Sequence, residues 1–152
     1  ASLPDDLLRG ARVVVLPRPD RPDAGIGTLR RRVKDPGDLE NPHVVKVVVD
    51  REGYALYFTR SAVPFLRPGH PSPIFWRHLG LYVYRRDFLL TLATLLPTPL
   101  ERAEGLEQLR VLENGFRIPT VETDADTIGV DTPEDLERVR QLIEVQTPTP
   151  QT

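Results

Sequence analysis

The sequence predicts an α/β fold, because short β-branched segments alternate along the chain with segments that carry helix start signals. The clearest strand is 44–49 (VVKVVV), which is apolar on both faces except at Lys46 and therefore suits a mostly buried position in a sheet. Two segments, 98–101 (TPLE) and 132–135 (TPED), each offer a Thr N-cap, a Pro at the first helical position and an early acidic residue. The 152 residues suffice for one domain with its own core.

The strand at 44–49 is expected to be the first arm of a hairpin. The turn 50–53 (DREG) follows it, and its glycine can adopt a positive φ. The segment 54–59 (YALYFT) then reads as the returning strand. Two weaker strands are expected before and after the hairpin, at 27–33 and at 79–84 (LGLYVY).

Helices and loops follow from capping and breaking residues. The two TP segments predict helices over 98–113, ended by Asn114-Gly115, and over 132–145. The apolar segment 87–96 predicts a third helix, ended by Pro97. The segment 5–16 suits a helix, although its three valines would equally suit a strand. Segments rich in Pro, Gly or polar residues are expected to be loops or a disordered tail: 17–24, 34–42, 64–73 and 146–152.

Composition excludes several functional classes. Twenty basic residues against 22 acidic ones leave a net charge of -2, which argues against a nonspecific nucleic-acid binder. No apolar run approaches the roughly 20 residues that span a bilayer, and no signal-peptide core is visible, so we expect a cytoplasmic protein without a membrane partner. The absence of cysteine excludes disulfides, thiolate metal sites and thiol catalysis.

The helix predicted at 98–113 carries a group of acceptors. At about 100° per residue, Glu101, Glu104 and Gln108 lie within about 60° of each other. They border an apolar stripe that is expected to face the core, formed by Leu106, Leu109 and Leu112. Glu107 points away from the core. Such an acceptor-rich border suits a polyhydroxylated ligand, and the alternative is a solvated helix face.

The strand predicted at 79–84 carries a second polar group. Alternation places one polar and aromatic set on a single face: His78, Gly80, Tyr82 and Tyr84. The opposite set is expected to face the core: Leu79, Leu81 and Val83. A polar aromatic face is a plausible ligand platform, and the alternative is an edge strand with one wet face.

A single carboxylate, Asp131, lies just before the second TP segment. A carboxylate at a strand end beside a helix start can hold Mg²⁺, which prefers oxygen ligands. The alternative is a residue that only supplements the helix cap. The chain has no GxGxxG and no GxxxxGK[ST] motif, so dinucleotide-binding and P-loop interpretations lack support.

Four segments together resemble the 3-deoxy-manno-octulosonate cytidylyltransferase (CMP-Kdo synthetase) family: 41–64, 77–89, 99–115 and 129–140. The resemblance keeps the order of the motifs and spans roughly 25–145. It implies a nucleotidyltransferase α/β sandwich, Rossmann-like with a mixed sheet, and a homodimer. It also implies CTP and the sugar acid Kdo as substrates, Mg²⁺ as cofactor, and a role in lipopolysaccharide synthesis.

The same resemblance implies roles for individual residues. Arg60 in FTRSAVP would lie near the sugar acid, and four further residues would contact Kdo: His78, Tyr82, Glu107 and Gln108. Asp131 would be catalytic as one of two metal-binding aspartates. A guanidinium suits the Kdo carboxylate, and a carboxylate or an amide suits its hydroxyls. The role of Glu107 rests on the resemblance alone, since the helix geometry favours Gln108.

Two family motifs are missing from the chain. Neither the PAR…R…GK phosphate-binding loop nor the QGDEP segment with the other aspartate occurs, residues 1–24 depart from the family pattern, and there is no Met. We therefore expect 1–145 to be the carboxy-terminal sugar-acid-binding and dimerisation portion, without turnover alone. The alternatives are a cytidylyltransferase for another 2-keto sugar acid, such as an acylneuraminate, and a non-catalytic dimerisation domain.

Overall fold

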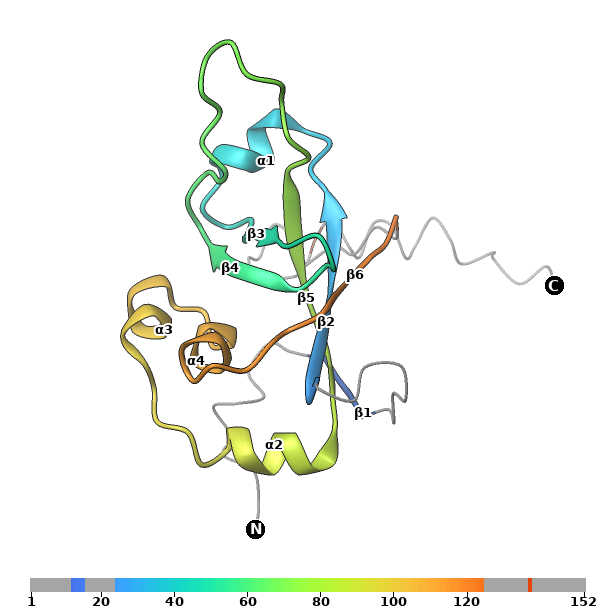
Figure 1. Cartoon of the computed structure of the whole chain (residues 1–152), viewed down its shortest axis with the longest axis vertical. Coiled ribbons are helices and arrows are strands. Elements are labelled where there is room, and N and C mark those ends of the chain that lie inside the picture. The colour runs from blue at the N-terminus through green and yellow to red at the C-terminus, as the bar shows by residue number, and fades with distance from the viewer. Residues whose placement is uncertain (1–11, 16–23, 125–136, 138–152) are drawn as a thin grey trace, which may run out of the picture.

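The computed structural model describes residues 12–15, 24–124 and 137. Its strands are β1 (Arg12–Val15), β2 (Ile26–Arg32), β3 (Lys46–Val49), β4 (Ala55–Thr59), β5 (Trp76–Tyr84) and β6 (Thr120–Glu122). Its helices are α1 (Pro36–Glu40), α2 (Arg86–Leu92), α3 (Pro99–Glu104) and α4 (Gln108–Glu113). Figure 1 shows α2 and α1 at opposite ends of the long axis, with the strands between them.

The six strands form one mixed sheet in which β5 is central. The order is β4-β3-β5-β2-β6, and β1 also pairs with β5. β2 runs antiparallel to β5 along its whole length, so β3 and β1 share the opposite edge of β5. β1 is parallel to β5 and β6 is parallel to β2. The predicted α/β fold with a mixed sheet is therefore confirmed.

The predicted hairpin is also confirmed. β3 and β4 pair antiparallel, from Lys46 opposite Thr59 to Val49 opposite Ala55. Gly53 in the connecting turn has φ 84°, which only glycine adopts without strain. The hairpin brings the residue after β4, Arg60, close to the segment that leads into β3.

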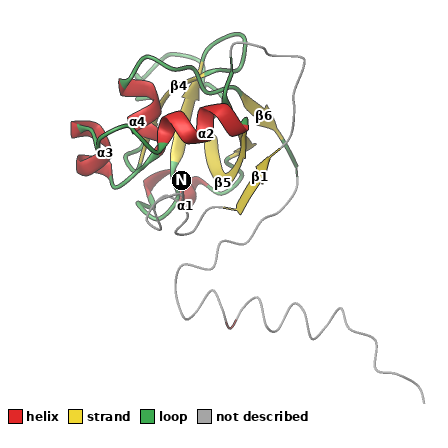
Figure 2. Ribbon diagram, turned by 90° about the horizontal axis from the view of Figure 1, so that it is seen from below, coloured by secondary structure: helices red, strands yellow, loops and turns green. Residues whose placement is uncertain are grey.

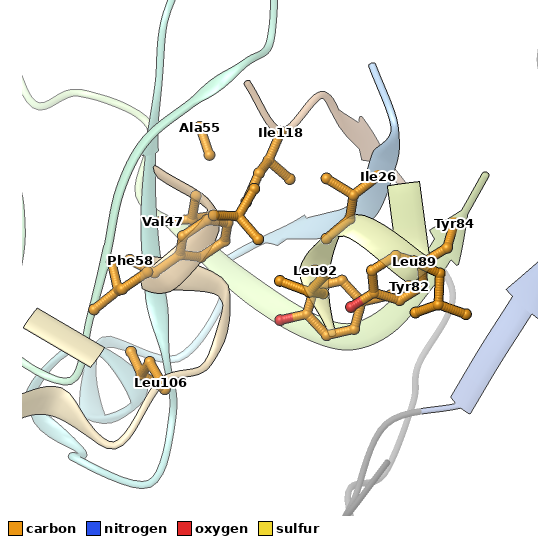
Figure 3. Packing of buried hydrophobic residues seen from close by; sticks show 12 residues of the cluster. Ile26, Val47, Ala55, Phe58, Tyr82, Tyr84, Leu89, Leu92, Leu106 and Ile118 are labelled. Carbon is orange, nitrogen blue, oxygen red and sulfur yellow. The ribbon is translucent and has the colours of Figure 1, made fainter. Parts of the chain in front are cut away.

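One face of the sheet packs against α2, α4 and the segment before α4 to form the core (Figure 3). The sheet contributes Ile26, Val47, Phe58, Tyr82 and Tyr84, and the helical side contributes Leu89, Leu92, Leu106 and Leu109. Figure 2 shows α2, α3 and α4 grouped together beside the strands. This packing sets the beginning of α4 against the aromatic residues of β5.

The single helix predicted over 98–113 is wrong. Gly105 adopts φ 64°, ends α3 and donates its amide to the Glu101 carbonyl at 2.8 Å. A new helix, α4, begins only at Gln108. Leu106 and Leu109 are buried as expected, whereas Leu112 is only half-buried. The stop at Asn114-Gly115 is confirmed, with φ 80° at Gly115.

The core face predicted for β5 is wrong for its second half. His78, Tyr82 and Tyr84 do share one face, because the Tyr82 ring contacts the His78 ring on one side and the Tyr84 ring on the other. The two tyrosines are buried in the core, while Leu81 and Val83 are half-buried on the opposite face. The reason is tertiary: α2, which directly follows β5, folds back over the tyrosine face. Leu79 is buried as predicted.

Other expectations differ in extent. The loop predicted at 34–42 contains α1, whose N-cap Asp35 accepts a hydrogen bond from the Gly37 amide. The helix predicted at 87–96 ends at Leu92, and the strand alternative within 5–16 is correct as β1. Several expectations lie outside the described residues: the loop 17–24 up to position 23, Asp131, the helix 132–145 except Glu137, and the tail 146–152. Within the described part, no helix is long and apolar enough to cross a membrane.

Candidate functional site

The candidate site combines residues from three parts of the chain. Arg60 follows β4, His78 and Tyr82 lie on β5, and Glu107 directly precedes α4. The rings of His78 and Tyr82 are 5.4 Å apart. Leu106 and Leu109, which flank Glu107 and Gln108, pack in the same core cluster as Tyr82 and Tyr84, so the start of α4 faces the aromatic side of β5. The structure thus brings the predicted contacts on β5 and α4 to one face of the sheet.

The β5 side of the site is aromatic and uncharged. Phe58 contacts the His78 ring at 4.9 Å, and Tyr82 contacts Tyr84 at 5.9 Å. Desolvation lowers the pKa of His78 to about 3. Desolvation, aided by nearby negative charge, raises the pKa of Tyr84 to about 12 and that of Tyr82 well above its ordinary value. All three side chains are therefore neutral near pH 7.

Hydrogen bonding indicates which tautomer of His78 is present. Nε2 of His78 lies 2.9 Å from Oγ1 of Thr28. The Thr28 hydroxyl lies 2.8 Å from the Leu81 carbonyl and 3.2 Å from that of Leu79, so its one proton is donated to a carbonyl. The hydroxyl must then accept from His78, which assigns the proton to Nε2 and leaves the lone pair on Nδ1. His78 is thus a neutral acceptor at Nδ1.

Within the described ranges, backbone carbonyls fix the Arg60 guanidinium, and no carboxylate forms an ion pair with it. Its Nε donates to the Glu104 carbonyl at 3.0 Å, and an Nη1 proton goes to the Pro42 carbonyl at 2.9 Å. These bonds use two of the five guanidinium N–H groups. The side chain is half-buried, so its position is defined while N–H groups are left for an anion.

Gln108 and Glu107 differ in their surroundings. Gln108 is 7% exposed, and no described residue hydrogen-bonds its side-chain amide. Glu107 is exposed, as the helix geometry predicted. The buried side-chain atoms without a partner in the described part of the chain do not include the amide of Gln108, so this amide still reaches solvent and is accessible to a polar ligand.

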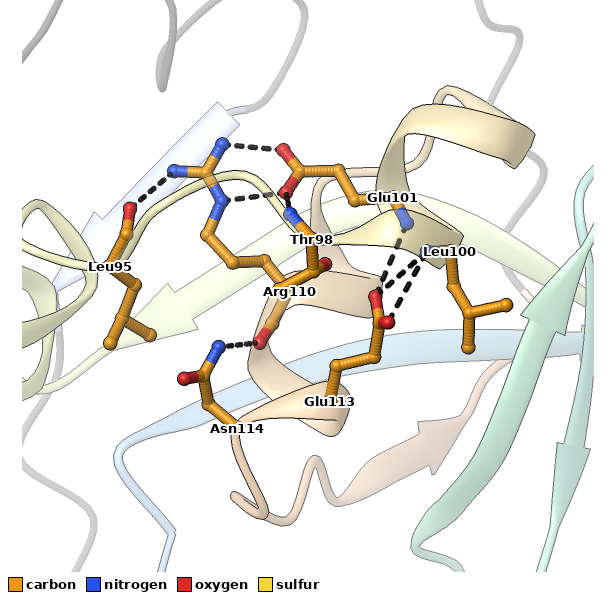
Figure 4. A network of polar contacts seen from close by, with 7 residues as sticks. All are labelled: Leu95, Thr98, Leu100, Glu101, Arg110, Glu113 and Asn114. Atoms are coloured by element: carbon orange, nitrogen blue, oxygen red, sulfur yellow. Dashed lines mark hydrogen bonds and ion pairs between the residues drawn. The ribbon is translucent and has the colours of Figure 1, made fainter.

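Glu101 and Glu104 were predicted as possible ligand acceptors or as a solvated face, and both predictions are wrong for Glu101. It is buried in a bidentate ion pair with Arg110, whose Nε lies 2.8 Å from Oε2 (Figure 4). Burial opposes the charge of Glu101, but hydrogen bonds from Arg110 and from the Thr98 amide outweigh it and lower its pKa. Glu104 is also engaged within the protein, by β4 and by Arg60.

Figure 4 shows that this ion pair belongs to a network between α3 and α4. Arg110 also donates to the Leu95 carbonyl at 3.3 Å. The Glu113 carboxylate accepts from the amides of Leu100 and Glu101, so a residue of α4 caps the beginning of α3. Arg110 and Glu113 were not singled out from the sequence, because their partners lie across the Gly105 break, where helical spacing no longer applies.

The metal prediction has no counterpart among the described residues. No group of three or more His, Cys, Asp or Glu side chains forms within 12–15, 24–124 and 137. Asp131 lies outside these ranges. A separate apolar groove lies between β2, β5 and β6, lined among others by Leu29, Leu81, Val83 and Val121. None of the predicted site residues that the structure describes lines it.

Comparisons with known proteins identify the same family as the four segments singled out in the sequence. A profile of the family described as "Cytidylyltransferase" matches residues 18–119. A 3-deoxy-manno-octulosonate cytidylyltransferase of Solibacter usitatus is 55% identical over 128 residues, and one of Geobacter metallireducens is 56% identical over 129. These matches cover 84% and 77% of this chain and 51% of each relative.

A solved structure gives the same result. It is described as CMP:2-keto-3-deoxy-manno-octonic acid synthetase complexed with CTP, and it aligns with a TM-score of 0.76 at 39% identity. The alignment covers 84% of this chain and 52% of that one. The chain therefore spans about half the length of the relatives it matches, and the predicted resemblance is confirmed. Its sequence and its fold place the chain in the cytidylyltransferase family.

Proposed function

We propose that this chain forms the sugar-acid side of an enzyme that transfers CMP from CTP to Kdo and releases pyrophosphate. The observation that carries the proposal is the position of Glu107 and Gln108: the residues that flank them, Leu106 and Leu109, pack in the same core cluster as the neutral Tyr82 and Tyr84 of β5. The relatives' names and the CTP complex of the structural neighbour support the reaction class.

The side chains match the chemistry of a sugar acid. The spare N–H groups of Arg60 suit a carboxylate, because a guanidinium binds carboxylates in a planar, charge-assisted fashion. His78 Nδ1 and the carboxylate of Glu107 are acceptors for sugar hydroxyls, and Gln108 can both donate and accept. Tyr82 supplies a neutral ring beside them. These groups would orient Kdo so that its anomeric hydroxyl attacks the α-phosphate of CTP.

The remaining parts of the proposal concern the whole enzyme. We include Mg²⁺ held partly by Asp131, a homodimer, a cytoplasmic location and a role in lipopolysaccharide synthesis, as the family resemblance implies. A bound Mg²⁺ would neutralise charge on the phosphates.

Replacement of Asp131 by Asn keeps the local hydrogen-bonding capacity and removes the charge. Mn²⁺ binding, followed by electron paramagnetic resonance, should therefore weaken while the melting temperature barely changes.

The proposal is tested by titrating the isotope-labelled 152-residue chain with Kdo and following its NMR spectrum. We expect the side-chain amide of Gln108 and the ring of His78 to shift with a common saturation curve. Arg60→Ala should weaken binding, and Glu122→Gln, an exposed carboxylate of β6, serves as the control. With CTP and Kdo together, we expect no pyrophosphate release from this chain alone.

Three outcomes would contradict the proposal in distinct ways. Tighter binding of an acylneuraminate than of Kdo would favour a cytidylyltransferase for another 2-keto sugar acid. Dimerisation in sedimentation experiments without binding of any sugar acid would favour a non-catalytic dimerisation domain. Pyrophosphate release by the 152-residue chain would show that it does not need a further nucleotide-binding half.

A further inference from the structure

We propose that Glu104 is a positioning residue that fixes Arg60 and ties it to the segment carrying Glu107 and Gln108. It would act through Arg60 and would not contact the sugar acid. The proposal rests on the proposed function, since Arg60 is there assigned to the carboxylate of the substrate. The observations that carry it are the contacts of both carboxylate oxygens and of the backbone carbonyl of Glu104.

Both carboxylate oxygens of Glu104 are bound by β4 or by the residue that follows it. Oε1 accepts from the Thr59 hydroxyl at 2.5 Å and from the Tyr57 hydroxyl at 3.4 Å. Oε2 accepts from the backbone amide of Arg60 at 3.0 Å. The short contact to Thr59 is in the range of a charge-assisted bond. The carboxylate thereby attaches the last residue of α3 to the end of β4.

The backbone of Glu104 binds the side chain of the same arginine. Its carbonyl accepts from Nε of Arg60 at 3.0 Å. Arg60 is therefore held by Glu104 at two points, the main chain and the guanidinium, which restricts its side-chain rotamers. Glu104 is followed by Gly105 and is three residues before Glu107. A displacement of Glu104 would thus move the anion-binding side and the hydroxyl-binding side of the site together.

Lys46 also holds the backbone of Arg60, at its carbonyl group. Its fully buried ammonium donates to the carbonyl of Arg60 and to that of Asn41, the latter at 2.9 Å. The Arg60 guanidinium donates to the carbonyl of Pro42, the next residue. The amide of Arg60 is thus bound by Glu104 and its carbonyl by Lys46. The charges of Lys46 and Glu104 also attract each other, which offsets part of the cost of burying the ammonium.

A direct role of Glu104 in binding the substrate is disfavoured by its surroundings. Hydrogen bonds from Thr59, the Arg60 amide and Tyr57 outweigh burial and keep the pKa of Glu104 below its ordinary value, so the group is an anion near pH 7. An anion whose oxygens already accept three hydrogen bonds would repel the carboxylate of a sugar acid. The arrangement suits a group that orients a cation for that carboxylate.

The first test measures the position of Arg60 without any ligand. In the full 152-residue chain with ¹⁵N-labelled arginine, the Nε–H signal of Arg60 is identified by its loss in Arg60→Lys. We expect its hydrogen exchange to accelerate by about tenfold or more in Glu104→Gln and in Glu104→Ala. Glu122→Gln, which removes an exposed carboxylate that pairs with Arg32, is the matched control and should leave the signal unchanged. Unchanged exchange in both Glu104 variants would overturn the proposal.

The second test separates positioning from direct contact by a double-mutant cycle with Kdo. We expect Glu104→Gln to weaken Kdo binding by about tenfold to a hundredfold in the wild-type background. In an Arg60→Ala background the same change should have little effect, since the arginine it positions is gone. Equal losses in both backgrounds would show that Glu104 contacts the ligand and would overturn the proposal.

The two tests also distinguish this proposal from the proposed function. If the wild-type chain does not bind Kdo but the exchange at Arg60 accelerates as expected, the sugar-acid function fails and the positioning of Arg60 by Glu104 stands. If Kdo binds through Arg60 and exchange is unaffected by Glu104, the positioning role fails and the function stands. Glu104→Gln retains an acceptor oxygen and nearly the same volume, so it is the variant to use if Glu104→Ala does not fold.

Discussion

The helical side and the sheet side of the candidate site keep polar groups in place by opposite means. On α3, Glu101 and Glu104 are charged, and cationic or hydrogen-bonding partners compensate each charge. On β5, His78 and Tyr82 are neutral, because burial among aromatic rings disfavours their charged forms. The charged glutamates of α3 therefore depend on keeping their hydrogen-bonding and cationic partners, whereas His78 and Tyr82 on β5 depend on staying buried in their neutral forms.

This difference places a cationic group and uncharged acceptors on separate sides of the candidate site. Arg60 is a cation whose spare N–H groups are available, and the nearby carboxylate of Glu104 is already occupied. The aromatic side offers acceptors without a net charge, so it neither repels nor traps an anion. Under the proposed function, the carboxylate of a sugar acid would bind Arg60 and its hydroxyls would bind the acceptors of the aromatic side.

The largest effect is expected from breaking the buried ion pair of the helical side. Arg110→Met leaves the carboxylate of Glu101 buried without its main partner, which should destabilise the chain by about 3–5 kcal/mol. Urea unfolding at pH 7 measures the change. The double variant Glu101→Leu/Arg110→Met should recover most of the loss, because no uncompensated charge remains. A loss below about 1 kcal/mol in Arg110→Met would mean that the pair is not buried in solution.

A smaller effect, about 2 kcal/mol between pH 6.5 and pH 5, is expected when pH is lowered, and it should begin on the sheet side. The pKa of His78 falls from 6.5 to about 3 on folding, so between these pH values His78 is protonated in the unfolded chain and neutral in the folded chain. The free energy of unfolding is therefore not reduced by His78 above pH 6.5, and it decreases as pH falls toward 3, by up to about 1.4 kcal/mol per pH unit. The pKa values of Glu101 and Glu104 are lowered from 4.5, so their contribution is lost only below that pH.

Urea unfolding of the wild type and of His78→Gln between pH 7 and about pH 5 checks this order. The wild type should lose stability across this interval, and the variant should show a flatter profile. Parallel profiles would show that His78 titrates freely in the folded chain. The Glu104→Gln variant should be less stable than the wild type by a nearly constant amount between pH 7 and about pH 5, and this difference should shrink only below pH 4.5, which separates the two sides experimentally.

The smallest effect is expected at the junction that separates α3 from α4. Gly105 has a positive φ, and no atom lies within 4 Å of the point that a Cβ would occupy there, so Gly105→Ala meets only backbone strain. The expected cost is about 1 kcal/mol in thermal or urea unfolding. Asn, which tolerates this conformation better, should cost less. A stabilising Gly105→Ala substitution would instead indicate that the chain prefers one continuous helix here.

Local signals in the sequence predicted much of the framework. Gly53 and Gly115 lie at the positive-φ positions that the turn and the helix stop require, and the hairpin of β3 and β4 follows from its β-branched residues. The Pro at the start of α3 marked that helix correctly. These features depend on a few neighbouring residues, so they can be recognised without knowledge of distant contacts. The four motifs likewise identify the family from contiguous stretches of sequence alone.

Of the site, the sequence by itself determined which residue types were available, and the resemblance named Arg60, His78, Tyr82, Glu107 and Gln108. Their roles toward a ligand remain predictions. Only the tertiary structure decided how they are surrounded. Which face of β5 is buried depended on where α2 folds, and the partners of Glu101 and Glu104 depended on the break at Gly105. Burial, pairing and the resulting pKa values are set by segments far apart in the chain, and the period of a single helix or strand carries no information about them.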